Sequence, residues 1–400
     1  MTIRNLLFGV LLAAAPLAHA GDWPNWRGPT RDGISTETGW TTQWPAGGPK
    51  QLWQAHVGLG CSAVHVSAGR AYTLGNKDET DTIYCFDAVT GKELWKHSYP
   101  SPLMPKYWEG GTLATPTVEG DRVYAVSKMG RLFCFDAATG KIVWQKNLEK
   151  DFGGKVPTWG FAGSPLILKD RLLLETGAPD GSVVALEKAT GQLVWKNGSD
   201  QAGYSTLQPF SLGGKDYLAN FNGVALAVLE QNGGKVVARY PFKTKYDVNA
   251  VTPLVSGDKL FIAAGYNHGS ALVKFTGSAL ERVWESNKMR NHFNSCVLVN
   301  GFLYGFDENA LACMELATGE VKWSEPSIGK ASLMLADGKL IVLAEKGDLI
   351  IAEPSPAAFK EIARAKVLGG KCWCVPVLAN GRVYAKNNAG DLVCLDVSGK

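Results

Sequence analysis

The sequence predicts an all-β fold, an eight-bladed β-propeller of four-stranded antiparallel blades that is closed by the N-terminal strand. The first observation is a ten-residue motif, Phe-Asp-Ala-Ala-Thr-Gly-Lys-Ile-Val-Trp at 135–144, which recurs at 86–95, 186–195 and 314–323. The second is its spacing, which is that of propeller blades. The third is that the two ends of the chain carry complementary halves of one repeat.

Each copy of the motif reads as the end of one strand, a tight turn and the start of the next strand. The acidic residue accepts backbone N–H groups across the turn, and the glycine supplies a position with φ > 0. Valine and tryptophan then begin the following strand. Because one strand–turn–strand unit cannot bury its apolar faces alone, neighbouring copies must stack.

Eight repeats are counted from the tryptophan position, with spacings of 39 to 51 residues. Two of these positions, within 234–238 and 359–363, have lost the tryptophan. Short apolar segments separated by turn residues fill the intervals, which is typical of antiparallel meanders. No segment keeps a 3.6-residue apolar period, so few helices are expected. The positions that keep the tryptophan are Trp53, Trp95, Trp144, Trp195, Trp284 and Trp323.

The two chain ends predict how the ring closes. The chain stops at Ser398–Lys400, in the middle of a repeat, and Lys50–Trp53 supplies the missing half near the start. The first strand is therefore expected to complete the last blade, which removes the exposed edges of an open ring.

The first twenty residues have the features of a secretory signal. Arg4 precedes an apolar stretch that ends in Ala18-His19-Ala20, a small-residue cleavage site. That stretch is too short to span a bilayer, and no cysteine follows the cleavage site, so neither a membrane span nor a lipid anchor is expected. We predict a secreted, periplasmic monomer with residues 1–20 removed after Ala20.

Residues 21–48 form an N-terminal arm ahead of the propeller, which covers 49–400. Proline and glycine are dense in this arm, which argues against regular structure. Trp23 and Trp26 are expected to anchor it by packing on the propeller surface, and the alternative is that they contact a ligand. The net charge is only +4 and no Lys/Arg run is interleaved with aromatic residues, so no nucleic acid partner is expected.

The repeated Ala-x-Thr-Gly-Lys-x-x-Trp resembles the tryptophan-docking motif of the pyrroloquinoline-quinone-like (PQQ-like) β-propellers. In that family the docking tryptophan packs against the turn glycine of a neighbouring blade. The opening at 22–29 is similar to that of secreted family members of unknown function. The resemblance assigns the docking role to Trp95, Trp144, Trp195 and Trp323 with Gly91, Gly140, Gly191 and Gly319.

The family divides into quinone-dependent dehydrogenases and non-catalytic propellers such as the outer-membrane assembly factor BamB. The alcohol dehydrogenase branch carries two adjacent cysteines, whereas this chain has Cys372-Trp373-Cys374. BamB is a lipoprotein, and this chain lacks the lipidation cysteine. The interpretation we favour is a non-catalytic binding or scaffolding propeller for a protein partner or a small molecule. The alternative is a quinoprotein-like oxidoreductase that uses pyrroloquinoline quinone with Ca²⁺.

The candidate binding site is the mouth of the central axis. The loops that lead into the innermost strands open on one face of a propeller, and polar and aromatic groups converging on a concave mouth suggest a binding site. The alternative is a hydrated channel whose aromatic residues merely close the ring. Tryptophan would stack on a planar or sugar-like ligand, and carboxylate and amide oxygens are ligands that Ca²⁺ prefers. The predicted residues are Trp108, Glu109, Trp159, Asp247, Asn249, His292, Asn294, Lys371 and Trp373.

The cysteines and histidines predict no catalytic or metal site. Neither a Gly-x-Ser-x-Gly nor a His-Glu-x-x-His motif occurs, and the histidines lack metal-ligand spacing. Cys61 aligns with Trp373 at the start of the innermost strand of an adjacent blade. A disulfide between Cys61 and either Cys372 or Cys374 is therefore conceivable.

Overall fold

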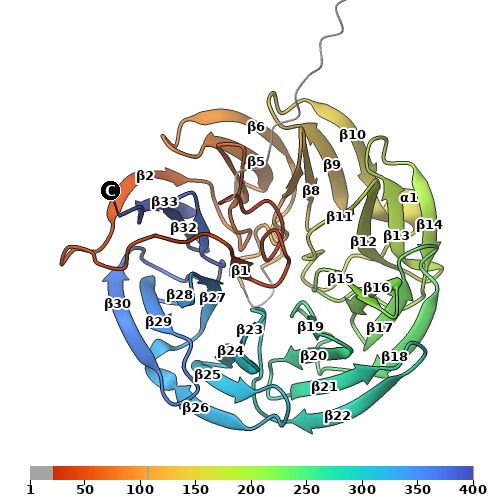
Figure 1. Cartoon of the computed structure of the whole chain (residues 1–400). Helices are drawn as coiled ribbons and strands as arrows, with labels where there is room; N and C mark the ends of the chain where they lie inside the picture. The colour runs from red at the N-terminus through yellow and green to blue at the C-terminus, as the bar shows by residue number, and fades with distance from the viewer. Residues whose placement is uncertain (1–20, 106–107, 400) are drawn as a thin grey trace, which may run out of the picture.

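Eight β-sheets surround a central axis like the blades of a propeller (Figure 1). The computed structural model describes residues 21–105 and 108–399. The predicted signal peptide, 1–20, lies outside these residues. Strands make up nearly all of the regular structure, and the predicted all-β, eight-bladed fold is confirmed.

Each blade is an antiparallel meander whose first strand is nearest the axis. Blades 1 to 4 consist of β3 (His65–Ser67), β4 (Arg70–Lys77), β5 (Thr80–Asp87) and β6 (Glu93–Pro100); β7 (Thr117–Glu119), β8 (Arg122–Val126), β9 (Arg131–Asp136) and β10 (Ile142–Asn147); β11 (Leu166–Leu168), β12 (Arg171–Ala178), β13 (Gly181–Glu187) and β14 (Leu193–Asn197); and β15 (Gln208–Leu212), β16 (Lys215–Phe221), β17 (Ala225–Glu230) and β18 (Val236–Pro241).

Blades 5 to 8 complete the ring. They consist of β19 (Leu254–Ser256), β20 (Lys259–Ala264), β21 (Gly269–Phe275) and β22 (Leu280–Ser286); β23 (Val297–Val299), β24 (Phe302–Asp307), β25 (Ala310–Glu315) and β26 (Val321–Glu325); β27 (Ala331–Ala336), β28 (Lys339–Ala344), β29 (Asp348–Glu353) and β30 (Lys360–Lys366); and β31 (Val377–Ala379), β32 (Arg382–Lys386) and β33 (Asp391–Asp396) with β2 (Lys50–His56). The helical elements are α1 (Leu148–Phe152) and η1 (Pro326–Ile328). Within the described part of the chain, no helix has the length and hydropathy needed to cross a bilayer.

The motif turn is built by its own side chains. Asp136 Oδ1 accepts the backbone N–H of Thr139 at 2.8 Å and the Thr139 hydroxyl at 2.7 Å. Gly140 then takes φ 69°, which a glycine adopts without steric cost. Asp87 and Thr90 make the same pair of hydrogen bonds in blade 1.

The tryptophan that follows each turn lies against the next blade. Trp95 Nε1 donates to Ala137 O at 3.0 Å, and a Cβ built on Gly140 would lie 2.6 Å from the Trp95 ring. A side chain at this glycine would displace the indole. Trp323 instead donates to Ser355 O at 2.8 Å and packs beside Phe359. The other tryptophans that lie against a glycine of the next blade pair as Trp53 with Gly91, Trp144 with Gly191, Trp195 with Gly234 and Trp284 with Gly319.

The N-terminal strand closes the ring. β2 pairs antiparallel with β33 from Lys50↔Asp396 to His56↔Asp391 and becomes the outermost strand of blade 8. Trp53 on β2 donates to Ala88 O of blade 1 at 3.1 Å. The predicted closure by the first strand is therefore confirmed.

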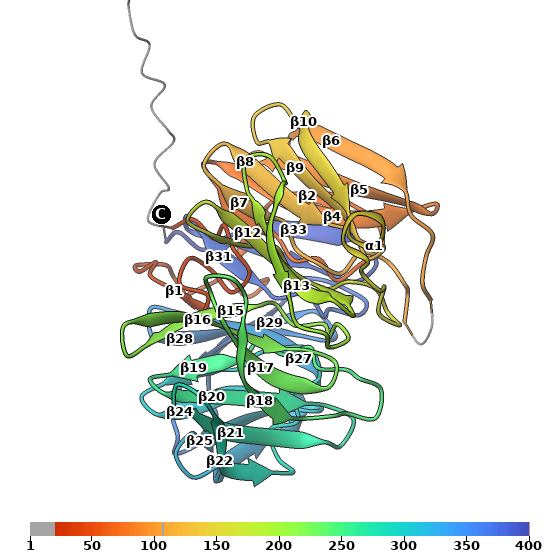
Figure 2. The same cartoon turned by 90° about the vertical axis from the view of Figure 1, so that its right-hand side faces the viewer.

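The N-terminal arm crosses one face of the ring. It contains a short strand, β1 (Ile34–Ser35), that pairs parallel with β27, so blade 7 has five strands rather than the predicted four. The arm carries no sequence repeat. The innermost strand of blade 7 has an edge with unpaired backbone groups, however, and two residues of the arm pair with that edge. Figure 2 shows β1 on one face of the disk and α1 on the opposite face.

The core lies between the faces of neighbouring sheets. Between blades 1 and 2, for example, Leu74, Ile83 and Cys85 pack with Phe133 and Phe135. The interior is thus distributed around the ring in inter-blade layers. The four cysteines at the equivalent motif position, Cys85, Cys134, Cys313 and Cys394, are fully buried in these layers and free.

Candidate ligand-binding site

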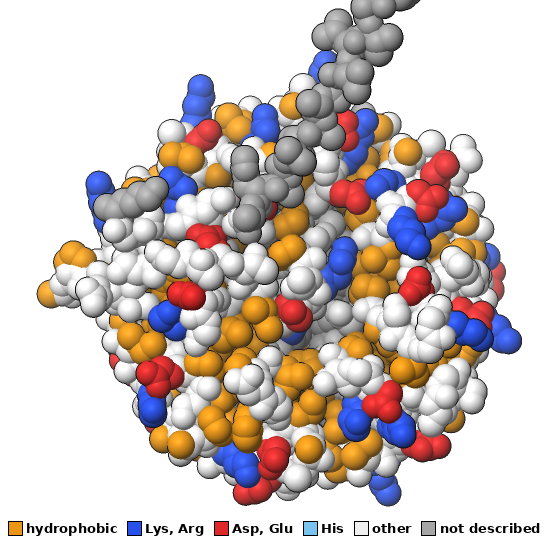
Figure 3. Space-filling model, in the orientation of Figure 1, with side chains coloured by type: hydrophobic (Ala, Val, Ile, Leu, Met, Phe, Trp, Pro, Cys, Tyr) orange, Lys and Arg blue, Asp and Glu red, His pale blue; other side chains and the backbone are white. Residues whose placement is uncertain are grey.

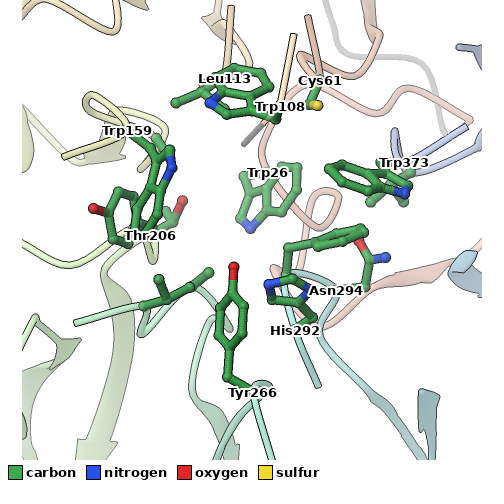
Figure 4. Close-up of a pocket in the computed structure, with 16 residues that line it drawn as sticks. Trp26, Cys61, Trp108, Leu113, Trp159, Thr206, Tyr266, His292, Asn294 and Trp373 are labelled. Atoms are coloured by element: carbon green, nitrogen blue, oxygen red, sulfur yellow. The ribbon is translucent and has the colours of Figure 1, made fainter. Parts of the chain in front are cut away.

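A cavity of about 200 Å³ lies on the axis, at the face where the innermost strands begin. Loops leading into the innermost strands of seven blades supply most of its lining, and the arm supplies one residue. Figure 4 shows these side chains arranged around the indole of Trp26. The lining residues are Trp26, Cys61, Trp108, Leu113, Trp159, Ala162, Tyr204, Thr206, Val248, Ala250, Tyr266, His292, Phe293, Asn294, Trp373 and Val375.

Aromatic rings form much of the cavity wall, and most of them are placed by loops between two blades. Trp159 follows α1 and contacts Tyr204, with 5.7 Å between ring centroids. On the other side, Phe293 contacts Trp373 at 4.9 Å. Tyr266 reaches the cavity from the turn between β20 and β21 and packs edge-on against His292.

Five of the nine predicted binding residues line this cavity. Trp108, Trp159 and Trp373 contribute ring surface, as expected for a stacking site. His292 and Asn294 contribute polar atoms, although the Asn294 amide already donates to Ala331 O. The expectation that the loops leading into the innermost strands surround a concave mouth thus agrees with where the structure places these five.

Glu109 and Lys371 lie outside the lining and bind each other. Lys371 Nζ is 2.7 Å from Glu109 Oε1, and the ammonium lies 4.6 Å from the Trp373 ring centroid. Burial acts to raise the pKa of Glu109, but the hydrogen bonds from Lys371 and Asn388 outweigh it, so the net shift is downward. This ion pair joins the loop after β6 to the loop before β31 and leaves neither charge facing the cavity alone.

Asp247 and Asn249 also lie outside the lining, on either side of Val248. Asn249 is buried, and its Nδ2 donates to Asn222 O at 2.7 Å and Phe242 O at 2.9 Å. Asp247 is half-buried in a tight turn with φ 56°. Both residues therefore shape the loop that presents Val248 to the cavity.

Trp26 is a lining residue for which the sequence favoured packing over a ligand role. Its Nε1 donates to Thr252 Oγ1 of blade 5 at 2.9 Å, which holds the indole across the axis. Tyr266 was also missed, because it lies in a turn inside blade 5 rather than in a loop between blades. The arm has no repeat pattern, so no sequence signal related Trp26 to the axis.

The cavity wall is electrically neutral at pH 7. Burial, together with the nearby Lys330 ammonium, lowers the pKa of His292 to about 4. Lys330 Nζ lies 3.1 Å from His292 Nδ1, so the neutral ring accepts a hydrogen bond there. Lys330 sits behind the lining, over the rings of Phe293 and Trp373. The lining itself contains no lysine, arginine, aspartate or glutamate among the described residues.

The cysteines near the mouth are thiols in this structure. Cys61 lines the cavity, while Cys372 and Cys374 are buried. Cys374 Sγ lies 3.9 Å from Lys386 Nζ, which donates to Gly60 O at 2.7 Å. Burial raises the pKa of Cys61 and Cys374, so both are poor nucleophiles as they stand. The disulfide between Cys61 and Cys372 or Cys374 stays a prediction.

The residues present do not fit a quinone with Ca²⁺. Glu109 is committed to Lys371, Asn249 directs its amide N–H groups at carbonyls, and Asp247 is left without a second carboxylate. The described residues hold no group of three or more His, Cys, Asp or Glu side chains that would bind a metal. The cavity wall also offers no cation for the carboxylates of the quinone, since Lys330 and Lys371 lie outside it.

Comparison with known proteins gives one family match. A family model described as outer membrane protein assembly factor BamB matches residues 39–128 and 79–325. No curated protein matches the chain by sequence.

Solved structures of similar shape include both branches of propeller. BamB from Moraxella catarrhalis is 15% identical with a TM-score of 0.64, over 87% of this chain and 99% of that chain. Quinohemoprotein alcohol dehydrogenase from Comamonas testosteroni is 12% identical with a TM-score of 0.67, over 95% and 81%. A europium-containing methanol dehydrogenase is 13% identical with a TM-score of 0.67, over 92% and 90%. At these identities the likeness concerns the fold alone.

Proposed function

Because the chain belongs to the family described as outer membrane protein assembly factor BamB, we propose that it is a secreted, periplasmic, non-catalytic propeller that binds a ligand in its axial cavity. The observation that carries this proposal is the cavity wall. Four tryptophans, two tyrosines, a phenylalanine and a neutral histidine face one open cavity on the axis. An apolar pocket with a few polar groups is the usual form of a binding site.

The wall specifies the chemistry of the ligand. Flat aromatic faces favour a planar or sugar-like ring, and the lining carries no charge to favour an ionic group. A cavity of about 200 Å³ suits a compact group, since apolar protein cavities of about 150 Å³ already hold benzene. The ligand is therefore a neutral small molecule with one or two rings, or an aromatic side chain that a protein partner inserts.

Native mass spectrometry of protein purified from its own host tests the proposal. We expect a retained small molecule on the parent protein, and its loss from the Trp159→Ala and Trp373→Ala variants. Trp44→Phe is the matched control, because Trp44 belongs to the arm and lies outside the cavity wall. If no small molecule is found, cross-linking must show a partner that the same two variants lose. Retention of either kind of ligand by both variants would disprove the proposal.

The dehydrogenase interpretation has its own test. The fold is shared with quinohemoprotein alcohol dehydrogenase, but the side chains at the axis do not form a Ca²⁺ or quinone site. Titration with pyrroloquinoline quinone and Ca²⁺, followed by tryptophan fluorescence, should give no saturable change. A saturable change that disappears in Trp373→Ala would instead support the oxidoreductase.

A further inference from the structure

Trp26 separates the axial cavity from two smaller cavities. It borders the space of about 200 Å³ above it, a space of about 20 Å³ lined also by Arg27 and His65, and one of about 10 Å³ lined also by Asn25 and Arg31. In Figure 4 its indole lies at the centre of the surrounding ring of side chains. Trp26 lines all three cavities, whereas Asn294 and Val375 line only the first and second and Thr206 lines only the first and third.

The arm lies on the face opposite the cavity mouth. Asp22 Oδ2 accepts the backbone N–H of Ala68 at 2.9 Å, and Glu37 Oε2 accepts that of Asn380 at 2.7 Å. Both backbone groups lie in turns that leave an innermost strand, whereas the cavity is lined by loops that lead into innermost strands. Figure 3 shows this arm face, with most charged side chains toward its periphery and apolar side chains nearer its centre.

The arm is fastened to many blades around the axis. The half-buried Arg27 side chain donates to Asp32 O at 2.6 Å within the arm and to Cys296 O before blade 6 at 2.7 Å. Arg31 donates to Ile167 O of blade 3 at 3.0 Å, on the far side of the ring. Val118 of blade 2 donates to Pro24 O at 2.9 Å. Any movement of the arm would break several of these hydrogen bonds at once.

We propose that the arm is the floor of the ligand site and that Trp26 determines how long a ligand the cavity accepts. The ligand part of this inference rests on the proposed function. The floor itself rests on the position of the indole between three cavities and on its hydrogen bond to Thr252. Trp26 is thus a specificity-determining residue supplied by the arm rather than by a blade.

The inference predicts a length limit for ligands. Each CH₂ group that enters an apolar cavity raises affinity about fourfold, and the gain stops when the chain meets a wall. In the parent protein this wall is the Trp26 indole. With alanine at position 26, the axial cavity joins the spaces beside Arg27 and Arg31, so longer ligands fit.

A homologous series of neutral probes measures the limit. Isothermal titration calorimetry with 4-methylphenol through 4-hexylphenol should show rising affinity and then a plateau or a fall for the parent. Trp26→Ala should move that break to a chain at least two carbons longer, and Trp26→Phe should move it less. Trp44→Phe should leave the break unchanged. An unchanged break in Trp26→Ala would overturn the inference while leaving the proposed function standing.

A second measurement is independent of ligand identity. Crystals of the parent under xenon pressure should hold xenon only in the axial cavity of about 200 Å³. Trp26→Ala crystals should hold xenon also in the smaller spaces beside Arg27 and Arg31. If the parent binds no alkylphenol, the xenon positions alone decide about the floor, and the proposed function is decided by its own mass-spectrometric test. If Trp26→Ala does not fold, both the alkylphenol titration and the xenon experiment are carried out on Trp26→Phe instead. Xenon at identical positions in parent and variant would refute the floor.

Discussion

Trp144 and Trp159 are close in sequence but have different surroundings. Trp144 Nε1 donates to Lys188 O at 3.0 Å, and its ring rests on Gly191 of the next blade. Trp159 instead faces the axis and contacts Tyr204. At the scale of the residue, distance from the axis decides whether an aromatic side chain joins two blades or forms the cavity wall.

Trp144→Ala should therefore destabilise the protein without changing the cavity. The change removes a nearly buried indole and a hydrogen bond between blades, so we expect a loss of about 3–5 kcal/mol in the free energy of unfolding. Urea denaturation measures the loss. Val143→Ala, at an exposed neighbouring position, should stay within about 0.5 kcal/mol of the parent. Equal stability of the two variants would contradict the docking role.

Glu175 should make stability depend on pH. Burial raises its pKa to about 8, although Asn220 Nδ2 and Gly203 N donate to its oxygens; Asp200 adds to the rise. The folded protein thus holds a proton that the unfolded chain releases near pH 4. This contribution is complete below about pH 4 and is lost as pH rises through 8.

Comparison with Glu175→Gln isolates this effect, because the other groups titrate in both proteins. The glutamine cannot ionise, but it leaves one N–H donor without an acceptor. This costs about 1–3 kcal/mol of stability at every pH. The melting temperature of the parent should fall relative to the variant between pH 5 and pH 9. Parallel curves over that range would show that Glu175 is already ionised at pH 5.

At the scale of the element, β2 and the arm do separate work. β2 covers the edge of β33 and completes blade 8. The arm covers the axis on one face and adds β1 to the innermost edge of blade 7. β2 is the missing part of the last repeat and completes the ring, whereas the arm lies outside the repeats and bounds the cavity.

Proline at both Gln54 and Ala55 should open the ring. Alternate residues of an antiparallel edge strand donate to the neighbouring strand, so one of these two must lose a ladder hydrogen bond. We expect a lower melting temperature and concentration-dependent aggregation, because the edge of β33 becomes free to pair with other chains. Serine at both positions is the control and should melt near the parent. Light scattering that stays flat for the proline variant would contradict closure by β2.

At the scale of the whole molecule, the predicted removal of residues 1–20 would place a new charge at the end of the arm. The Cα of Gly21 lies so close to Glu37 that a Cβ there would be 2.7 Å from Oε2. Burial raises the pKa of Glu37. Cleavage after Ala20 would create an ammonium group on Gly21 beside this carboxylate, which favours its ionised form.

The mature protein should thus begin at Gly21, which intact-mass measurement of periplasmic protein checks. Glu37→Gln should lower the melting temperature of the processed protein more than that of a form that keeps extra residues before Gly21. A secreted protein that still carries Met1, or a lipidated terminus, would refute the proposed localisation.

The blades and their closure were predictable because each repeat encodes its own turn and strands. Asp136, Thr139 and Gly140 make the turn with no help from distant residues. The site was predictable in part, since Trp159 and Trp373 occupy loops whose place in the ring follows from the repeat. The role of Trp26 depends on Thr252, 226 positions away, and that of Asn249 depends in part on the carbonyl of Asn222, 27 positions away, so the local sequence pattern indicates neither role.

The pairing of β2 with β33 also has a mechanical side. Lys50, the first residue of β2, and Asp396, the last residue of β33, are partners in the ladder. A force that pulls these ends apart therefore loads one pair of hydrogen bonds at a time, as in a zipper, instead of shearing the whole strand. The strand pairing that closes the ring is thus weak under tension, and a steady pull on the C-terminal segment is expected to open blade 8 first.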